Sequence, residues 1–183
     1  MSSQPTDVRI DVADLVLARA PGGRPVRLGE ITGVQVVVLL RHRHRLPCQQ
    51  HLVQVRETER DPGIGLLLVG FSPPAPLAAI ARHHGWPGEI LTDPDRALYR
   101  RLGIRRAPLR QVYSVGTVAT YAAAVARGHR LTRPVEDTRQ LGADAIMING
   151  VIRRLWRPRT PNDRPDAASV VAAARSWLRR PSG

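Results

Sequence analysis

Residues 34–60 read VQVVVLLRHRHRLPCQQHLVQVRETER, and the rest of the predicted architecture is built around them. The run at 34–40 is almost entirely aliphatic and β-branched, which is typical of a strand buried on both faces of a sheet. A basic loop, RHRHRLP, follows it. The segment CQQHLVQVRETER then has helical character from Cys48 until the turn residues DPG. The stretch therefore predicts a strand, a loop and a helix, in that order.

The same pattern repeats toward the C-terminus. A second aliphatic run, Ile64–Phe71, is followed by Ser-Pro-Pro and an alanine-rich helix over residues 75–84. Residues 89–91 read as a short strand. Asp93 is then expected to cap a helix over 94–103, with Pro94 in its first position. Strand-helix repeats of this kind favour parallel strands joined by right-handed crossovers.

Antiparallel hairpins are predicted on both sides of these repeats. Residues 15–18 and 25–28 flank the turn-forming APGGRP, and the strands 143–149 and 151–156 meet at an Asn-Gly pair. A terminal helix is expected over 167–178. The whole is predicted to be one α/β domain over 1–183 with a mixed sheet and helices on both faces, an insertion near 105–141, and disordered ends at 1–8 and 180–183.

Composition narrows the classes of partner. All 28 basic residues are arginine, and the formal net charge is +13. The arginines are spread from Arg9 to Arg180 without interleaved aromatic residues, and a lysine-free chain is typical of GC-rich coding sequence. Nucleic-acid binding is therefore not expected. An anionic small molecule or an acidic protein partner remains open.

Cellular location is inferred from two further features. The single cysteine, Cys48, excludes an intramolecular disulfide, and the N-terminal MSSQPTDVRIDVADL lacks the charged and apolar regions of an export signal. A reducing cytoplasm is expected. The longest apolar runs, at 34–40 and 63–71, are far too short to cross a bilayer, so no membrane insertion is expected either.

Several segments, taken in order, resemble the peroxiredoxin-like AhpC/TSA branch of the thioredoxin-fold superfamily. They cover most of the chain except 105–139: GGRPVRLGEITGVQVVVLLRH, PCQQHLVQVRE, LLLVGFSPPAPLAAIARHHGW, EILTDPDRALYRRLGI, QLGADAIMINGVIRRLWR and DRPDAASVVAAARSWL. The resemblance implies a thioredoxin-like fold. It also implies a thiol oxidoreductase that takes its electrons from an external thiol and needs no bound cofactor.

In this family the loop before the helix carries CxxC, or TxxC preceded by a proline. Here the string is RLPC, so Cys48 matches the second cysteine, which is also the peroxidatic position. Arg45 occupies the first position and Arg41 the proline position. Dithiol chemistry is therefore unavailable, and any peroxidase reaction would use Cys48 alone.

Local chemistry favours a reactive Cys48. A helix N-terminus and nearby cations both lower a thiol pKa, and the free N–H groups are expected to be those of Gln49, Gln50 and His51. The resemblance implies that the thiolate attacks a peroxide O–O bond while an arginine stabilises the leaving oxygen. The residues assigned to catalysis are Cys48, Arg45 and Arg139, and those assigned to the peroxide or another anionic substrate are Arg41, Arg43, His44, Pro47 and Gln49.

Three alternatives stay open. A lone cysteine is often just a small buried apolar residue, and the chain would then be a redox-inactive binding module. The chain could instead be a repurposed enzyme of specialised metabolism with a pocket formed by loop 41–51. The nitrogen and sulfur atoms of His42, His44, Cys48 and His51 could also bind zinc or copper, although their spacing matches no recognised structural zinc site. A homodimer is compatible with all of these readings.

Overall fold

The fold is taken from a computed structural model that describes residues 4–40, 46–59, 61–106, 140–158 and 164–179. The side chains of residues 46–48 also lie outside the described part. Within it, the strands form one eight-stranded mixed sheet in the order β1-β8-β7-β4-β5-β6-β2-β3. Their bounds are β1 Pro5–Asp11, β2 Val16–Arg19, β3 Val26–Arg27, β4 Val34–Leu39, β5 Ile64–Gly70, β6 Glu89–Thr92, β7 Ala143–Ile148 and β8 Val151–Trp156.

The centre of the sheet is parallel and its flanks are antiparallel. β4 pairs with β5, and β5 with β6, in parallel register. β7 runs antiparallel to β4, so Ala143 at its start lies opposite Leu39 at the end of β4. The carboxyl ends of the parallel strands and the beginning of β7 therefore share one edge, the edge where ligands bind in open α/β sheets.

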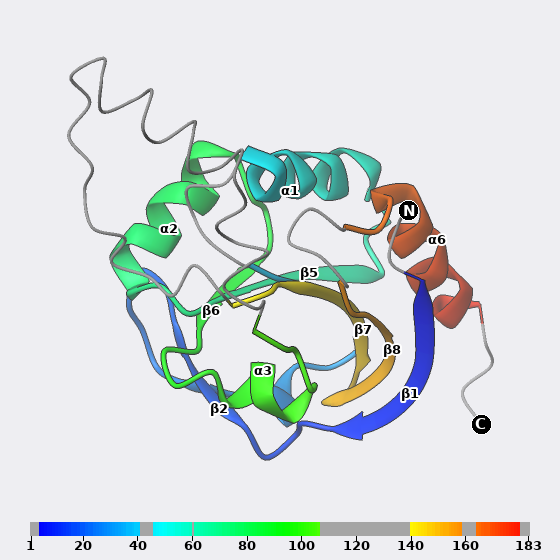
Figure 1. The fold of residues 1–183 in the computed structure, drawn as a ribbon, viewed down its shortest axis with the longest axis horizontal. Coiled ribbons are helices and arrows are strands. Elements are labelled where there is room, and N and C mark those ends of the chain that lie inside the picture. Colours follow the sequence, from blue (N-terminus) through cyan, green and yellow to red (C-terminus); the bar gives the residue numbers. More distant parts are fainter. Residues whose placement is uncertain (1–3, 41–45, 60, 107–139, 159–163, 180–183) are drawn as a thin grey trace.

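Helices cover both faces of the sheet. In Figure 1, α1 (Leu46–Thr58), α2 (Pro74–His83) and α6 (Ala167–Leu178) lie on one side, and α3 (Ala97–Arg101) lies on the other. The short 3-10 helix η1 spans Leu28–Glu30. Among the described helices none has the length and apolar character needed to cross a membrane.

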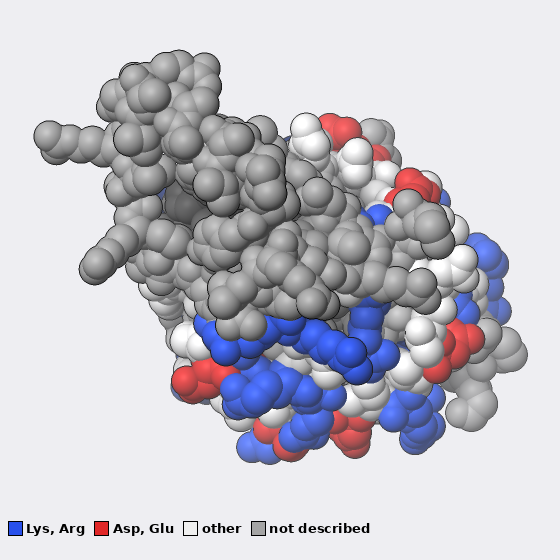
Figure 2. Space-filling model, viewed as in Figure 1, with Lys and Arg blue, Asp and Glu red and all other residues white. Residues whose placement is uncertain are grey.

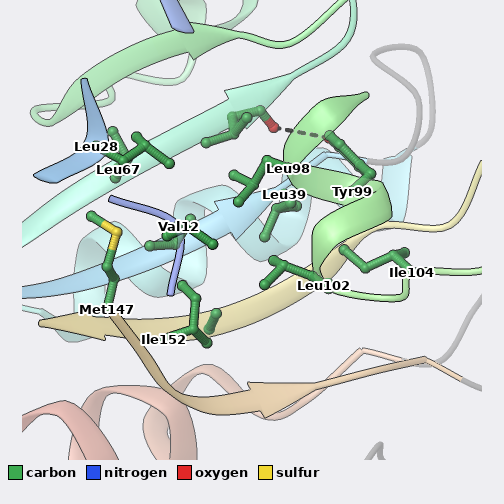
Figure 3. Close-up of a cluster of buried hydrophobic side chains, with 14 of the residues drawn as sticks. Val12, Leu28, Leu39, Leu67, Leu98, Tyr99, Leu102, Ile104, Met147 and Ile152 are labelled. Atoms are coloured by element: carbon green, nitrogen blue, oxygen red, sulfur yellow. Dashed lines mark hydrogen bonds between the residues drawn. The ribbon is translucent and has the colours of Figure 1, made fainter. Parts of the chain in front are cut away.

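Strand side chains alternate between two apolar clusters because successive residues of a strand point to opposite faces. Val37 and Leu39 of β4 join the cluster beneath α3, whereas Val36 and Val38 join the cluster beneath α1, α2 and α6. Figure 3 shows the first cluster, which contains Leu98, Tyr99 and Leu102 of α3 together with Leu39, Leu67, Met147 and Ile152 of the strands. Both faces are buried, which explains the continuous aliphatic runs.

Most predicted elements are confirmed. The mixed sheet with helices on both faces is present, and the terminal helix has the predicted bounds. The first hairpin pairs Leu17 with Val26. At the second hairpin Asn149 has φ +49° and Gly150 has φ +75°, the left-handed conformations that an Asn-Gly turn supplies.

The helix predicted over 94–103 is shorter than expected. α3 begins only at Ala97, and Arg96 before it has φ +56°. Asp93 nevertheless accepts hydrogen bonds from the backbone N–H groups of Ala97 and Leu98, at 2.8 and 2.9 Å. The prediction erred because the carboxylate caps the helix across an intervening turn rather than from the adjacent position.

The expectation that residues 1–8 are disordered is wrong for residues 5–8. β1 pairs antiparallel with β8, from Pro5 opposite Trp156 to Asp11 opposite Val151. Only Val8 and Ile10 of this strand pack against the core, so its apolar pattern is weak. Backbone pairing with β8 orders this strand, although the apolar pattern of its sequence does not predict a strand.

Residues 107–139, the bulk of the predicted insertion, lie outside the described residues. Their boundaries are close together, because Arg106 forms an isolated antiparallel bridge with Gln140. The backbone N–H of Leu141 also donates to the carbonyl of Arg105 at 3.3 Å. The segment thus leaves and rejoins the domain at neighbouring points, as expected for an insertion.

Candidate functional site

Most of the predicted site residues follow β4 in the chain, at the carboxyl end of that strand. The last described residue after β4 is Leu40, and α1 begins at Leu46. Cys48 is the third residue of that helix and Pro47 is the second. Gln49 is partly buried in the same turn. The predicted Arg41, His42, Arg43, His44, Arg45 and Arg139 lie outside the described residues.

The start of α1 corrects one detail of the prediction. Because the helix begins two residues before Cys48, the N–H groups without an intrahelical acceptor belong to the turn 46–48, not to Gln49, Gln50 and His51. Proline is tolerated in this turn because its missing N–H has no partner there in any case. Cys48 therefore lies in the first turn of the helix.

A buried ion pair lies one turn further along α1. The Nε2 of His51 is 2.7 Å from the Oδ1 of Asp144, and the two side chains are only 2% and 0% exposed. Asp144 is the second residue of β7, opposite Val38 of β4. It lies on the same face of its strand as Ile146, so it points into the layer that contains α1 and α6.

Arg164 completes the cluster from the segment before α6. Its Nη1 donates to the Oδ2 of Asp144 at 2.9 Å and, more weakly, to the carbonyl of Ala143 at 3.3 Å. Its Nη2 donates to the carbonyl of Leu39 at 3.1 Å. One guanidinium thus joins the end of β4 to the start of β7, and we refer to His51, Asp144 and Arg164 as the buried charge cluster.

Asp144 is ionised in this setting. Burial on its own raises the pKa of a carboxyl, but the adjacent His51 and Arg164 outweigh it, and the pKa of Asp144 is lowered. An ionised carboxylate can only accept hydrogen bonds, so the Nε2–H of His51 is the donor. This assignment leaves Nδ1 as the nitrogen of His51 that can gain or lose a proton.

That second nitrogen is a distinctive feature of the cluster. His51 Nδ1 is buried and has no hydrogen-bond partner among the described residues. An unsatisfied buried polar atom typically costs about 1–3 kcal/mol. Atoms of this kind in a native fold often mark a site with a functional role.

The described residues do not supply a metal centre. They contain no group of three or more His, Cys, Asp or Glu side chains arranged to hold an ion. His42 and His44 of the alternative metal set fall outside the described part, and the Nε2 of His51 is already bonded to Asp144. The metal reading therefore stays an untested alternative.

The arginines of the described residues lie on several different elements of the fold. Figure 2 shows arginine and acidic side chains interspersed over the surface where α3 lies. Arg101 pairs with Asp14 there at 2.9 Å. Two further ion pairs, Arg154 with Asp7 and Arg175 with Glu59, lie on other elements.

The sequence carries two signals of the buried charge cluster. Asp144 is the only charged residue in the strand ADAIMI, and a charge inside a buried strand requires a partner. His51 lies one turn before the apolar Val55, which is buried, and residues four apart share a helix face, so His51 lies on the inner face of α1. What the sequence could not show is that these two residues, 93 positions apart, meet.

The family model described as AhpC/TSA antioxidant enzyme matches residues 51–162, more than half of the chain. The match begins at His51 and so does not include Cys48. It does include His51 and Asp144.

Two relatives carry the name peroxiredoxin-like 2C. The chain is 29% identical over 101 residues to the protein from Bos taurus, which covers 52% of this chain and 44% of the relative. It is 30% identical over 108 residues to the protein from Takifugu rubripes, covering 55% of this chain and 48% of the relative. The matched region thus spans less than half the length of either relative.

Solved structures support the fold across nearly the whole chain. The bacterioferritin comigratory protein of Xanthomonas campestris, studied for alkyl peroxide reduction, superposes with a TM-score of 0.67 at 13% identity, covering 95% of this chain and all of the other. Peroxidoxin BcpB from Mycobacterium tuberculosis gives 0.64 at 13% identity, covering 93% and 97%. The thioredoxin-like architecture expected from the resemblance is therefore confirmed.

Proposed function

Since this chain belongs to the AhpC/TSA antioxidant enzyme family, we propose that it is a thiol peroxidase in which Cys48 is the only redox-active residue. The substrate class is a hydroperoxide. An external thiol acts as the reductant. The observation that carries the proposal is the position of the sole cysteine in the first turn of α1, the helix that follows the central strand β4 in the chain.

The physical setting of Cys48 favours a thiolate. The first turn of a helix presents unpaired N–H groups and the positive end of the helix dipole, and both stabilise an anion. α1 has 13 residues, long enough for this effect to be developed. A lowered thiol pKa increases the reactive fraction at neutral pH.

The reaction balances with one cysteine and two equivalents of external thiol. The thiolate sulfur attacks one peroxide oxygen, the O–O bond breaks, and the alkoxide that leaves takes up a proton to become an alcohol. The sulfur is oxidised to a sulfenic acid. A first external thiol condenses with it and releases water, and a second reduces the mixed disulfide and restores the thiol.

Cations near Cys48 in the sequence would assist this chemistry. We assign stabilisation of the leaving oxygen to Arg45 and Arg139, and contact with the substrate to Arg41, Arg43, His44, Pro47 and Gln49. Arg139 is assigned from the family resemblance and the others from their proximity in sequence to Cys48. Alkyl hydroperoxides are the first substrates to test, because one structural neighbour is described as reducing alkyl peroxides.

The experiment measures peroxide and thiol together. One equivalent of cumene hydroperoxide is added to the reduced protein, free thiol is titrated with time, and sulfenic acid is trapped with dimedone. We expect loss of one thiol and a dimedone adduct on Cys48. The Cys48→Ser variant is expected to abolish peroxide consumption in the presence of dithiothreitol.

Gln54→Ala is the matched control, because Gln54 is exposed on the same helix and belongs to none of the proposed contacts. It is expected to retain the wild-type rate. A wild-type reaction that is slow, does not saturate with peroxide and continues in Cys48→Ser would contradict the proposal.

That contrary outcome would favour a redox-inactive binding module or a repurposed enzyme. The observation behind both alternatives is Arg45, which replaces the first cysteine of the family's CxxC. An anionic ligand would then be expected to bind without oxidising Cys48. Calorimetry with anionic metabolites on the Cys48→Ser protein distinguishes these readings from the peroxidase.

A further inference from the structure

We propose that His51, oriented by Asp144, accepts the thiol proton of Cys48, so that the cysteine reacts as one half of a thiolate–imidazolium pair. The inference deepens the proposed function and depends on it for the identity of the reacting thiol. It assigns a role to His51, which lies in the region matched by the family model and outside the arginine-containing loop 41–45.

The first support is the spacing along α1. Cys48 and His51 are three residues apart in a continuous helix, Leu46–Thr58. Residues at this spacing lie on the same face of a helix, with Cβ atoms about 5–6 Å apart. Helical side chains also lean toward the N-terminus, which directs the ring of His51 toward the turn that holds Cys48.

The second support is the hydrogen bonding of the ring. Asp144 fixes Nε2 at 2.7 Å, which sets both the tautomer and the orientation of the imidazole. Nδ1 is buried and unpartnered among the described residues. A nitrogen in this state can accept a proton from a thiol, and the carboxylate behind the ring stabilises the imidazolium that forms, as in other nucleophile–His–Asp arrangements.

The third support is the charge balance. Within the described part of the chain, the charged groups packed at His51 are Asp144 from β7 and, behind it, Arg164 from the segment before α6. Arg164 already balances the single negative charge of Asp144. A protonated His51 would therefore leave one buried positive charge in excess, and a thiolate at Cys48 would neutralise it.

Two other charged contacts of the described part of α1 lie at a different point of the helix. Arg56 donates to the carbonyl of His84, and Glu59, just beyond the helix, pairs with Arg175 at 3.6 Å. Both contacts involve the C-terminal end of α1. Among the described residues, the charged side chains beside His51 are therefore those of the buried charge cluster.

The test measures thiol ionisation without peroxide. The rate of alkylation of Cys48 by iodoacetamide is followed from pH 5 to 10 in the wild type, in His51→Gln and in His83→Gln. Glutamine can still donate to Asp144 but cannot take up a proton. His83 is exposed at the end of α2 and serves as the matched histidine control.

We expect the alkylation rate of His51→Gln at pH 7 to fall about tenfold, because the rate profile moves to higher pH, while its maximum at high pH stays the same. The profile of His83→Gln should match the wild type. A folded His51→Gln protein with an unchanged pH profile would overturn the inference.

A second measurement applies if His51→Gln fails to fold. In ¹⁵N-histidine spectra near pH 7, Nδ1 of His51 should be protonated in the wild type and unprotonated in Cys48→Ser, because the serine variant lacks the anion. Identical Nδ1 signals in the two proteins would overturn the inference.

The experiments test the peroxidase function and the Cys48–His51 pair independently of each other. If the wild type consumes no peroxide but His51→Gln still slows alkylation, the peroxidase function is wrong and the Cys48–His51 pair stands. If peroxide is consumed and His51→Gln leaves the alkylation profile unchanged, the pair is wrong and the peroxidase function stands.

Discussion

The hydroxyl of Tyr99 donates a hydrogen bond of 2.6 Å to the backbone carbonyl of Leu40, the residue directly after β4. A longer contact of 3.2 Å joins the same hydroxyl to the carbonyl of Val69 in β5. The neighbouring carbonyl of Leu39 accepts from Arg164. Side chains from α3 and from the segment before α6 thus hold the end of the strand that leads to Cys48.

Tyr99→Phe should lower the free energy of unfolding by about 1 kcal/mol, since it removes a buried hydrogen bond without changing the ring. Urea denaturation at pH 7 measures the loss. Val16→Thr is the control, because Val16 is 54% exposed and the change should stay within about 0.5 kcal/mol. Equal unfolding midpoints for Tyr99→Phe and wild type would show that the hydroxyl contributes nothing.

Asp144→Asn should lower the free energy of unfolding at pH 7 by about 3 kcal/mol, because Arg164 and His51 would lose their buried counter-charge. The pKa of Asp144 is lowered by these neighbours despite its burial. Its ionised form therefore stabilises the fold above the unfolded pKa near 3.8, and this stability is lost as the pH falls through the folded value.

The difference between wild type and Asp144→Asn should accordingly be constant from pH 7 to 5 and shrink below pH 4. Urea denaturation across this range gives the difference at each pH. Asp14→Asn is the control, since Asp14 also has its pKa lowered, by a hydrogen bond from Arg101, but on an exposed surface where salt screens the pair. A difference that persists undiminished at pH 3 would contradict the assignment for Asp144.

Arg164→Lys should destabilise the protein by about 1–3 kcal/mol. The planar guanidinium of Arg164 donates hydrogen bonds to the carboxylate of Asp144 and to the carbonyls of Leu39 and Ala143. A single ammonium group cannot reproduce that geometry. Thermal and urea denaturation measure the effect. Arg154→Lys is matched to it, because Arg154 pairs with the exposed Asp7 and should change stability by under about 0.5 kcal/mol. A comparable loss in both variants would mean that these contacts of Arg164 are not specific.

Gly150→Ala and Gly33→Ala separate backbone strain from crowding. Both glycines have left-handed φ, +75° and +77°. A methyl group at Gly33 would meet nothing within 4 Å, whereas one at Gly150 would lie 2.8 Å from the Cβ of Ala13. We expect a loss of about 1 kcal/mol for Gly33→Ala from strain alone, and about 1–3 kcal/mol more for Gly150→Ala. Equal losses in urea denaturation would exclude the steric contribution.

Local sequence patterns predicted most helices and strands. They failed where a segment's structure depends on a contact with a residue or strand elsewhere in the chain. The aliphatic runs at 34–40 and 64–71 became β4 and β5, because burial on both faces needs apolar side chains at every position. β1 was missed because its order comes from backbone pairing with β8. The start of α3 was misplaced because the carboxylate of Asp93 reaches Ala97 across a turn.

The sequence alone determined most of the strands and helices in their order, the presence of a single cysteine and the family resemblance, since each of these depends on local pattern or on composition. Only the folded chain brought His51, Asp144 and Arg164 together, from a helix, a strand and a connecting segment far apart in sequence. The physical reason is that a buried charge is stable only beside its partner, and strand order and face, not sequence distance, decide which residues become partners.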